Sequence, residues 1–271
     1  MPLVEVAPDR RLNVVRRGEG PPLLLIQGMS GNVTHWGEPF LRALAERFDV
    51  VAFDHRGVGW SDRVTEPFTI RDLADDAARV LDAVGIDRVH VLGISMGGMV
   101  AQELALAHRE RVERLVLGCT YAGGEGSALT APEVVQLLGE AMLSGDRERA
   151  MRVGFQVNLS QTHRAQPGAF EEFQRIGLMK PAAVQVIALQ AQAIQSHDTS
   201  TRLPSLDAPT LVVHGTEDRM LVVDNGRLIA RLVPDARLVE LEGVGHMFWW
   251  EQPERVAELL AEFLLEAPVA Q

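Results

Sequence analysis

The stretch VLGISMGG, residues 91–98, decides the fold of this chain, because two kinds of local pattern meet in it. An apolar run typical of a strand leads into it, and MVAQELALA at 99–107 follows with the composition of a buried helix. Ser95 stands between Gly93 and Gly97, which have no Cβ and let a strand and a helix approach closely. The pattern predicts a tight strand-to-helix turn that presents one hydroxyl.

Strand patterns recur along the rest of the chain. We predict strands as a hairpin pair at 4–6 and 12–17, and then at 21–28, 48–54, 88–94, 114–120, 208–215 and 236–243. Most of these runs are apolar on both faces, which is typical of central parallel strands covered by helices on either side. The expected class is therefore α/β, with a mostly parallel central sheet flanked by helices.

Helical patterns lie between the predicted strands. Residues 71–84 carry apolar side chains at helical spacing, with Thr69 and Asp72 arranged as a capping box and Gly85 as a stop. Residues 253–265 show the same spacing and begin with a proline, which suits a first helical turn. Both apolar stripes are predicted to face the core.

One long segment breaks the alternation. Between the strand that ends near Cys119 and the strand that begins at Pro209, the sequence contains helical patterns and no convincing strand. We expect a core formed by residues 1–122 and 207–271, with a helical cap subdomain at 123–206. The cap either completes the fold or encloses an apolar substrate.

Three helices are predicted inside this cap. The first begins after a capping box of Thr130 and Glu133, with Pro132 in its first turn. The other two cover 168–178 and 182–195.

Composition excludes several classes of protein. The formal net charge of −11 and the absence of a basic stripe argue against nucleic-acid binding. Lys180 is the only lysine and precedes Pro181, so no GxxxxGK[ST] phosphate loop exists. Cys119 is the only cysteine, which excludes an internal disulfide and favours a small buried side chain. No apolar run is long enough to span a membrane, and we expect a cytoplasmic protein that could form homo-oligomers.

The spacing G-x-S-x-G around Ser95 has a chemical meaning in this context. A serine hydroxyl is a weak nucleophile, so catalysis needs it exposed on a tight turn, beside a general base and near fixed N–H donors. The N-terminus of the following helix adds a positive dipole that stabilises a developing negative charge. We therefore predict that Ser95 is a catalytic nucleophile.

Over essentially its full length, the chain resembles the α/β-hydrolase fold family. The matching motifs are QGMSG at 27–31, FDHRGVGWSD at 53–62, GISMGG at 93–98, HGTEDRM at 214–220 and GVGH at 243–246. The family supplies its catalytic groups in the chain order serine, acid, histidine. The resemblance implies that Ser95 is the nucleophile, Asp218 the acid and His246 the base.

The histidine and the acid each have competitors. His246 follows the last predicted strand in a glycine-rich turn, whereas the other histidines lack that placement. Glu217 is the alternative to Asp218, because either carboxylate could accept from the imidazole. With His246 as the base, activity is expected to fall as the pH drops through its ordinary pKa of about 6.5.

Backbone donors complete the site that the resemblance implies. The oxyanion hole is formed by the N–H groups of Met29 and Met96, supported by Gly28, Gly93 and Gly97. Many relatives have histidine where this chain has Gln27, so the usual hydrogen bonding of that loop is altered while the backbone donor is kept.

A serine nucleophile favours acyl transfer, since haloalkane dehalogenases and epoxide hydrolases of this family use aspartate there. The chain looks like the branch of enol-lactonases, small carboxylesterases and acyl-homoserine lactonases. We expect an enzyme that hydrolyses a small apolar ester or lactone through an acyl-enzyme, with neither metal nor cofactor. The alternatives are a carbon–carbon bond hydrolase of aromatic degradation, a perhydrolase, and a hydrolase-like receptor that binds its ligand without turnover.

Overall fold

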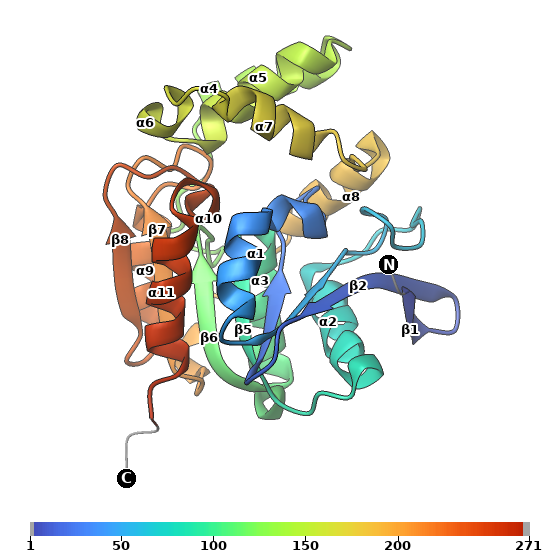
Figure 1. Cartoon of the computed structure of the whole chain (residues 1–271), viewed down its shortest axis with the longest axis vertical. Helices are drawn as coiled ribbons and strands as arrows, with labels where there is room; N and C mark the ends of the chain where they lie inside the picture. Colours follow the sequence, from blue (N-terminus) through green and yellow to red (C-terminus); the bar gives the residue numbers. More distant parts are fainter. Residues whose placement is uncertain (1–2, 268–271) are drawn as a thin grey trace.

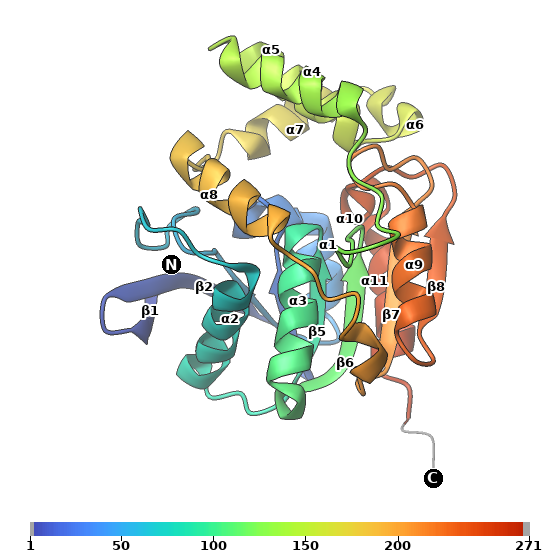
Figure 2. The same ribbon diagram turned by 180° about the vertical axis from the view of Figure 1, so that it is seen from behind.

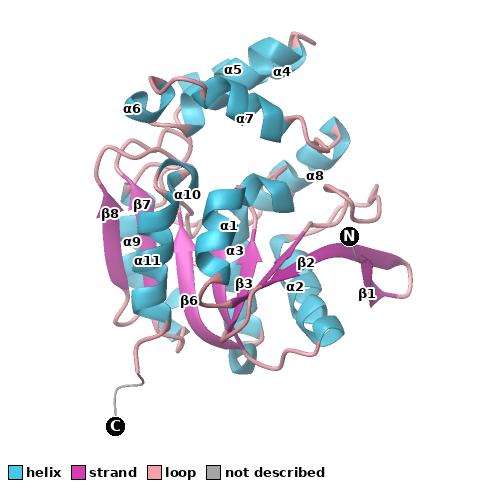
Figure 3. Cartoon of the chain, in the orientation of Figure 1, coloured by secondary structure: helices cyan, strands magenta, loops and turns pink. Residues whose placement is uncertain are grey.

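A computed structural model describes residues 3–267, and the outermost residues of the predicted core segments, 1–2 and 268–271, lie outside the described part. An eight-stranded sheet with the order β1-β2-β4-β3-β5-β6-β7-β8 forms the centre of the molecule (Figure 3). Strands β3 to β8 are parallel to one another, whereas β1 and β2 form an antiparallel hairpin and β2 runs antiparallel to β4. The strands are β1 (Leu3–Ala7), β2 (Arg10–Arg17), β3 (Pro22–Ile26), β4 (Asp49–Phe53), β5 (Val89–Ile94), β6 (Val112–Gly118), β7 (Thr210–Gly215) and β8 (Arg237–Leu241). The predicted α/β class and the mostly parallel sheet are confirmed.

Helices cover both faces of the sheet. On one face lie α1 (Glu38–Ala45) and α11 (Pro253–Leu264), and on the other α2 (Ile70–Val84), α3 (Met96–Ala107) and α9 (Asp224–Leu232) (Figures 1 and 2). Each face has its own buried apolar cluster, one under α2 and α3 and one under α1 and α11. Burial of these two clusters holds the strand ends in place, because packed interiors deform little. The short elements are η1 (Val33–Trp36), η2 (Arg109–Arg111), η3 (Leu203–Ser205) and α10 (Phe248–Glu251).

Of the two predicted capping boxes, one is confirmed and the other is wrong. Asp72 accepts a hydrogen bond from the Thr69 N–H at 2.8 Å, the Thr69 hydroxyl accepts from the Asp72 N–H, and Gly85 ends the helix in the left-handed region. Thr130 instead donates its hydroxyl to the carbonyl of Met220 at 2.7 Å. The helix that follows begins after Ala131 without a side-chain cap, because the Thr130 hydroxyl is hydrogen-bonded to a residue distant in sequence.

The segment between β6 and β7 is helical. Its helices lie beyond the carboxyl ends of the parallel strands (Figures 1 and 2). They are α4 (Pro132–Leu143), α5 (Arg147–Asn158), α6 (Gln161–Arg164), α7 (Ala169–Gly177) and α8 (Val184–Gln195). Helices α4 and α5 share a small buried cluster of Val134, Ala141, Val153 and Val157, apart from the two main cores. The helices predicted at 168–178 and 182–195 are present, while the cap boundaries at 123 and 206 stay a prediction.

Candidate active site

Ser95 occupies a sharp turn between β5 and α3. Its backbone has φ 53° and ψ −124°, a combination that is costly for any residue with a Cβ. A Cβ on Gly97 would lie 2.0 Å from the carbonyl oxygen of Ile26, and one on Gly93 would lie 2.3 Å from the carbonyl oxygen of Gly97. Both glycines are therefore required for this turn, which leaves Ser95 partly exposed at its apex.

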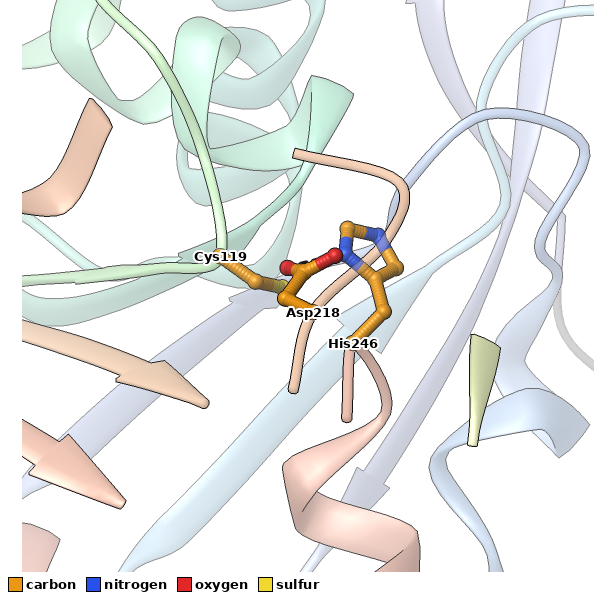
Figure 4. Close-up of side chains that lie close together, drawn as sticks. All are labelled: Cys119, Asp218 and His246. Carbon is orange, nitrogen blue, oxygen red and sulfur yellow. Dashed lines mark hydrogen bonds and ion pairs between the residues drawn. The ribbon is translucent and has the colours of Figure 1, made fainter. Parts of the chain in front are cut away.

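The predicted acid and base meet across two loops. Asp218 follows β7 and His246 follows β8, and the two parallel strands bring them together, so that His246 Nδ1 lies 2.7 Å from Asp218 Oδ2. Glu217, the alternative acid, is exposed and accepts from the Gln161 N–H at 3.2 Å. Figure 4 shows the carboxylate of Asp218 directed at the His246 ring, whose other nitrogen faces away from it.

Cys119 lies at the same place as these two residues. Its sulfur, an oxygen of Asp218 and a ring nitrogen of His246 all lie within 4.8 Å of one another (Figure 4). Burial raises the pKa of this thiol, while contacts with His246 and with the backbone of Ser95 lower it. The thiol therefore lies between the acid–base pair and the turn that carries Ser95.

The hydrogen bonds of residues 3–267 include none between the Ser95 hydroxyl and His246. Such contacts are often long in enzymes without substrate and tighten in the substrate complex. Catalysis through Ser95 therefore requires that this hydrogen bond form when substrate is bound.

Electrostatics at the buried pair favour an ionised acid and a strongly basic imidazole. Burial raises the pKa of Asp218, but the charge of His246 and hydrogen bonds from His214 and His246 outweigh it, and the pKa falls to about 2. Burial lowers the pKa of His246, yet Asp218 and Cys119 outweigh it and raise that pKa well above 6.5. An ionised carboxylate can only accept, so Nδ1 of His246 is the donor and the opposite nitrogen is the basic one.

His246 differs in this respect from five other histidines. Burial lowers the pKa of His35, His55, His90, His163 and His197. An imidazole that becomes more basic on burial needs a buried partner of opposite charge, which His246 has in Asp218.

Two backbone N–H groups are available beside the serine. Within the described residues, neither Met29 nor Met96 uses its N–H in a hydrogen bond. Met96 is the first residue of α3, where N–H groups have no helical partner and the helix dipole favours negative charge. A Cβ on Gly28 would lie 3.1 Å from the Ser95 Cβ, so the loop that carries Met29 packs directly on the serine. The pair can serve as an oxyanion hole.

The side chain of Gln27 shapes that loop. The side-chain Oε1 accepts from the Gly28 N–H at 2.9 Å, and the backbone carbonyl oxygen of Gln27 accepts from His55 Nε2 at 2.9 Å. A Cβ on Gly31 would lie 2.5 Å from the Gln27 side chain, so the loop folds tightly around the glutamine. Gln27 therefore holds this loop in place through its own hydrogen bonds.

The helical segment braces the same loop from the other side. Gln190 of α8 is fully buried and its Oε1 accepts from the Ser30 N–H at 2.8 Å. Asn32 donates its Nδ2 to the carbonyl of Met179 at 2.8 Å. The position of Met29 is thus coupled to the helices above the sheet.

Sequence reasoning missed three contributors to this site, which are His214, Cys119 and Gln190. His214 ends β7 four residues before Asp218, and that spacing is the one sequence signal that could have singled it out. Cys119 was expected to be a small buried side chain, and it is buried, but its contacts with the acid and the base were not foreseen.

Among the described residues, the His, Cys, Asp and Glu side chains that could together hold a metal ion are Cys119, Asp218 and His246. The Nδ1 proton of His246 already occupies Asp218 Oδ2, so a metal ion would have to displace the hydrogen bond between them. The expectation of a metal-free and cofactor-free site stays a prediction. None of the described helices is both long and apolar enough to cross a membrane.

This fold and this arrangement of serine, histidine and carboxylate define a class. A family model for the alpha/beta hydrolase fold matches residues 21–253, and the chain belongs to that family. The relative named "Putative carbamate hydrolase RutD" in Azorhizobium caulinodans is 30% identical, across 91% of this chain and 92% of its own length. The 2-hydroxymuconate semialdehyde hydrolase of Pseudomonas sp. strain CF600 is 31% identical, across 98% and 94%.

The chain is also similar to the solved structure of the enol-lactonase from Burkholderia xenovorans LB400. The two share 26% of their residues with a TM-score of 0.84, and the match covers 98% of this chain and all of that one. The family and these relatives support a hydrolase, and their names divide among different substrates.

Proposed function

We propose that this protein is a serine hydrolase that cleaves carboxylic esters or lactones, acyl-homoserine lactones among them, through an acyl-enzyme on Ser95. The observation that carries the proposal is the buried 2.7 Å contact between His246 Nδ1 and Asp218 Oδ2. It fixes the proton of His246 on Nδ1 and leaves Nε2 as a base for the serine hydroxyl. The enol-lactonase likeness supports the lactone part of the proposal.

Acylation follows from these groups. The Ser95 oxygen attacks the carbonyl carbon as His246 Nε2 takes the hydroxyl proton, and the new C–O bond places a negative charge on the carbonyl oxygen. The N–H groups of Met29 and Met96 stabilise this oxyanion. Collapse expels the alcohol oxygen, which receives the proton from His246. For a lactone this oxygen remains on the same molecule, as the hydroxyl end of the acyl group.

Deacylation uses the same base. Water gives a proton to His246 Nε2 and attacks the acyl carbon, and collapse of the second tetrahedral intermediate releases the acid and returns the proton to Ser95. Asp218 stays ionised throughout and stabilises the imidazolium that forms twice in each cycle. The acid product carries away one hydroxyl derived from water.

A second candidate is a carbon–carbon bond hydrolase of aromatic degradation. The similarity to 2-hydroxymuconate semialdehyde hydrolase favours it, because that relative covers nearly the whole chain. Such an enzyme would use the same serine, histidine and acid on a ring-cleavage dienoate. The two candidates differ in the substrate that is turned over.

The test is a substrate screen with matched variants. Wild type, Ser95→Ala and the exposed-serine control Ser144→Ala are assayed on p-nitrophenyl esters and lactones of graded acyl length, and on a ring-cleavage dienoate. Turnover of esters or lactones that survives in Ser144→Ala and is lost in Ser95→Ala supports the proposal. Turnover that persists in Ser95→Ala shows that another group is the nucleophile.

Labelling separates the remaining outcomes. A fluorophosphonate is expected to modify Ser95, identified by peptide mass spectrometry, and to abolish ester turnover. Stoichiometric labelling without multiple turnover on any ester, lactone or dienoate would favour a receptor. Faster turnover of the dienoate than of every ester and lactone would favour the carbon–carbon hydrolase.

A further inference from the structure

Asp218 is contacted by a second imidazole besides His246. His214, at the end of β7, places its Nε2 3.2 Å from Asp218 Oδ2 and 2.6 Å from the carbonyl oxygen of Leu221. The side chains of His214 and Asp218 are both fully buried. A second histidine on a buried carboxylate is a costly arrangement unless its hydrogen bonds are used.

The partners of His214 fix where its proton lies. A carbonyl oxygen only accepts, so Nε2 must carry the proton that it donates to Leu221, and Asp218 Oδ2 lies 3.2 Å from the same nitrogen. Nδ1 has no hydrogen-bond partner in the described part of the chain. Gly226 of α9 packs against it, since a Cβ there would lie 2.8 Å from Nδ1. Helix α9 thus holds the ring with its protonated nitrogen beside the acid.

With this contact, the carboxylate of Asp218 is surrounded by donors. Its Oδ1 accepts from the N–H groups of Met220 at 2.8 Å and Leu221 at 2.9 Å. Its Oδ2 accepts from His246 and lies 3.2 Å from His214 Nε2. The two backbone contacts keep the carboxylate in place even without His214, so the particular effect of His214 falls on Oδ2, the oxygen that holds the base.

We propose that His214 is a positioning residue of the triad: the positive end of its Nε2–H dipole, beside Asp218 Oδ2, keeps that oxygen on His246 Nδ1 and limits how strongly the acid retains a proton on the base. This inference rests on the proposed function. Loss of the His214 donor leaves Oδ2 a stronger acceptor, which stabilises the protonated form of His246.

Other titratable groups near this cluster are Cys119, Glu240 and Arg227. Cys119 contacts His246 from the end of β6, and its thiol is fully buried. Glu240 of β8 pairs with His214 across the sheet and is held by Arg227 of α9. Of these groups, Glu240 also responds to His214, which contributes to lowering its pKa, but Arg227 lowers that pKa most.

A pair of amide variants separates the donor from the packing. His214→Gln places an N–H near the present Nε2, whereas His214→Asn is shorter and withdraws its amide toward Gly226. We expect the acid limb of kcat/KM to move up by about one pH unit in the asparagine variant. Below that limb, activity falls about tenfold, while the alkaline plateau stays within about threefold of wild type. The glutamine variant is expected to titrate with the wild type.

A second measurement does not depend on turnover. The pKa of His246 is followed directly by NMR titration of its ring protons in each variant. This titration tests the role of His214 even if the protein hydrolyses no ester or lactone. Absence of hydrolysis would defeat the proposed function and would leave the role of His214 to be decided by the titration. His90→Asn is the control, because His90 is another buried strand histidine and its ring packs on Phe48. It is expected to leave the titration of His246 unchanged.

An upward shift of the His246 titration in His214→Asn, absent in His214→Gln and His90→Asn, supports the proposal. Coincident titration curves for the two amide variants, or a downward shift in His214→Asn, overturns it. Circular dichroism checks that each variant is folded. If His214→Asn does not fold, His214→Met removes the donor with an apolar side chain of similar reach, and the same outcomes apply.

Discussion

Replacing Ser95 by glycine is expected to stabilise the protein while it abolishes turnover. The φ of 53° and ψ of −124° at this position cost a residue with a Cβ about 1–3 kcal/mol, and glycine adopts them without that cost. Glycine in turn adds about 0.5–1 kcal/mol of backbone entropy to the unfolded chain. The Ser95 hydroxyl has no hydrogen-bond partner among residues 3–267, so its removal costs little.

The balance is a gain of about 1 kcal/mol in the free energy of unfolding. For a chain of 271 residues, the usual entropy of unfolding converts this gain into a rise in Tm of roughly 2 °C. Ser95→Ala keeps the Cβ and hence the strain, so its Tm is expected to stay within about 1 °C of wild type. The difference between the two variants therefore isolates the strain at the turn.

Scanning calorimetry of both variants measures that difference. Ser144, with φ −64° and ψ −21° at the end of α4, is the matched control, because any residue with a Cβ adopts this helical conformation without strain. There Ser144→Gly is expected to be less stable than Ser144→Ala. A Tm for Ser95→Gly at or below that of Ser95→Ala, with the Ser144 pair behaving normally, would refute the claim that the turn stores strain.

Three further predictions concern the base, the turn and the loop. The acid limb of wild-type kcat/KM is expected above pH 6.5, because Asp218 raises the pKa of His246 and protonation removes the base as the pH falls. An acid limb at or below pH 6.5 in a pH–rate profile would contradict this prediction. Gly97→Ala is expected to lower the free energy of unfolding in urea by more than about 2 kcal/mol, since its Cβ would collide with the Ile26 carbonyl. Gly139→Ala in α4, which has open space around it, is expected to raise the free energy of unfolding by about 0.5–1 kcal/mol. Equal stability of the two variants would count against the close approach at Gly97. Gln190→Met is expected to lower kcat about tenfold, because the loop that carries Met29 loses a hydrogen bond. The free energy of unfolding is expected to stay nearly unchanged, because a buried unpaired Nε2 is removed together with that hydrogen bond. A kcat equal to wild type in steady-state assays would show that Gln190 does not contribute to the site.

The sequence predicts features whose causes lie close together in the chain. The turn at Ser95 is specified by two glycines within five residues, and the buried strands by apolar residues on both faces. The positions of Asp218 and His246 follow from the loops after two strands, once the chain order of the motifs is known. In these cases a short segment carries its own steric or hydrophobic requirement, and the structure adds the distances.

Contacts between distant segments are not readable in the same way. Thr130 has the local pattern of a helix cap, but Met220, distant in sequence, offers a carbonyl that captures its hydroxyl. Gln190 reaches Ser30 across 160 positions, with no local pattern to announce the contact. Likewise, His214 meets Asp218 only because the loop between them reverses direction, and Cys119 meets His246 only through the order of the strands.

Lys180, the only lysine of the sequence, lies exposed between α7 and α8 with a φ of 57°. Its carbonyl oxygen accepts from Asn32 at 3.3 Å, in the loop that continues from Met29. Amine-directed chemistry would therefore couple to a single side chain, in a segment that touches this loop. A fluorophore attached there would report how that segment moves when a ligand arrives, and a resin attached there would tether the protein by that segment.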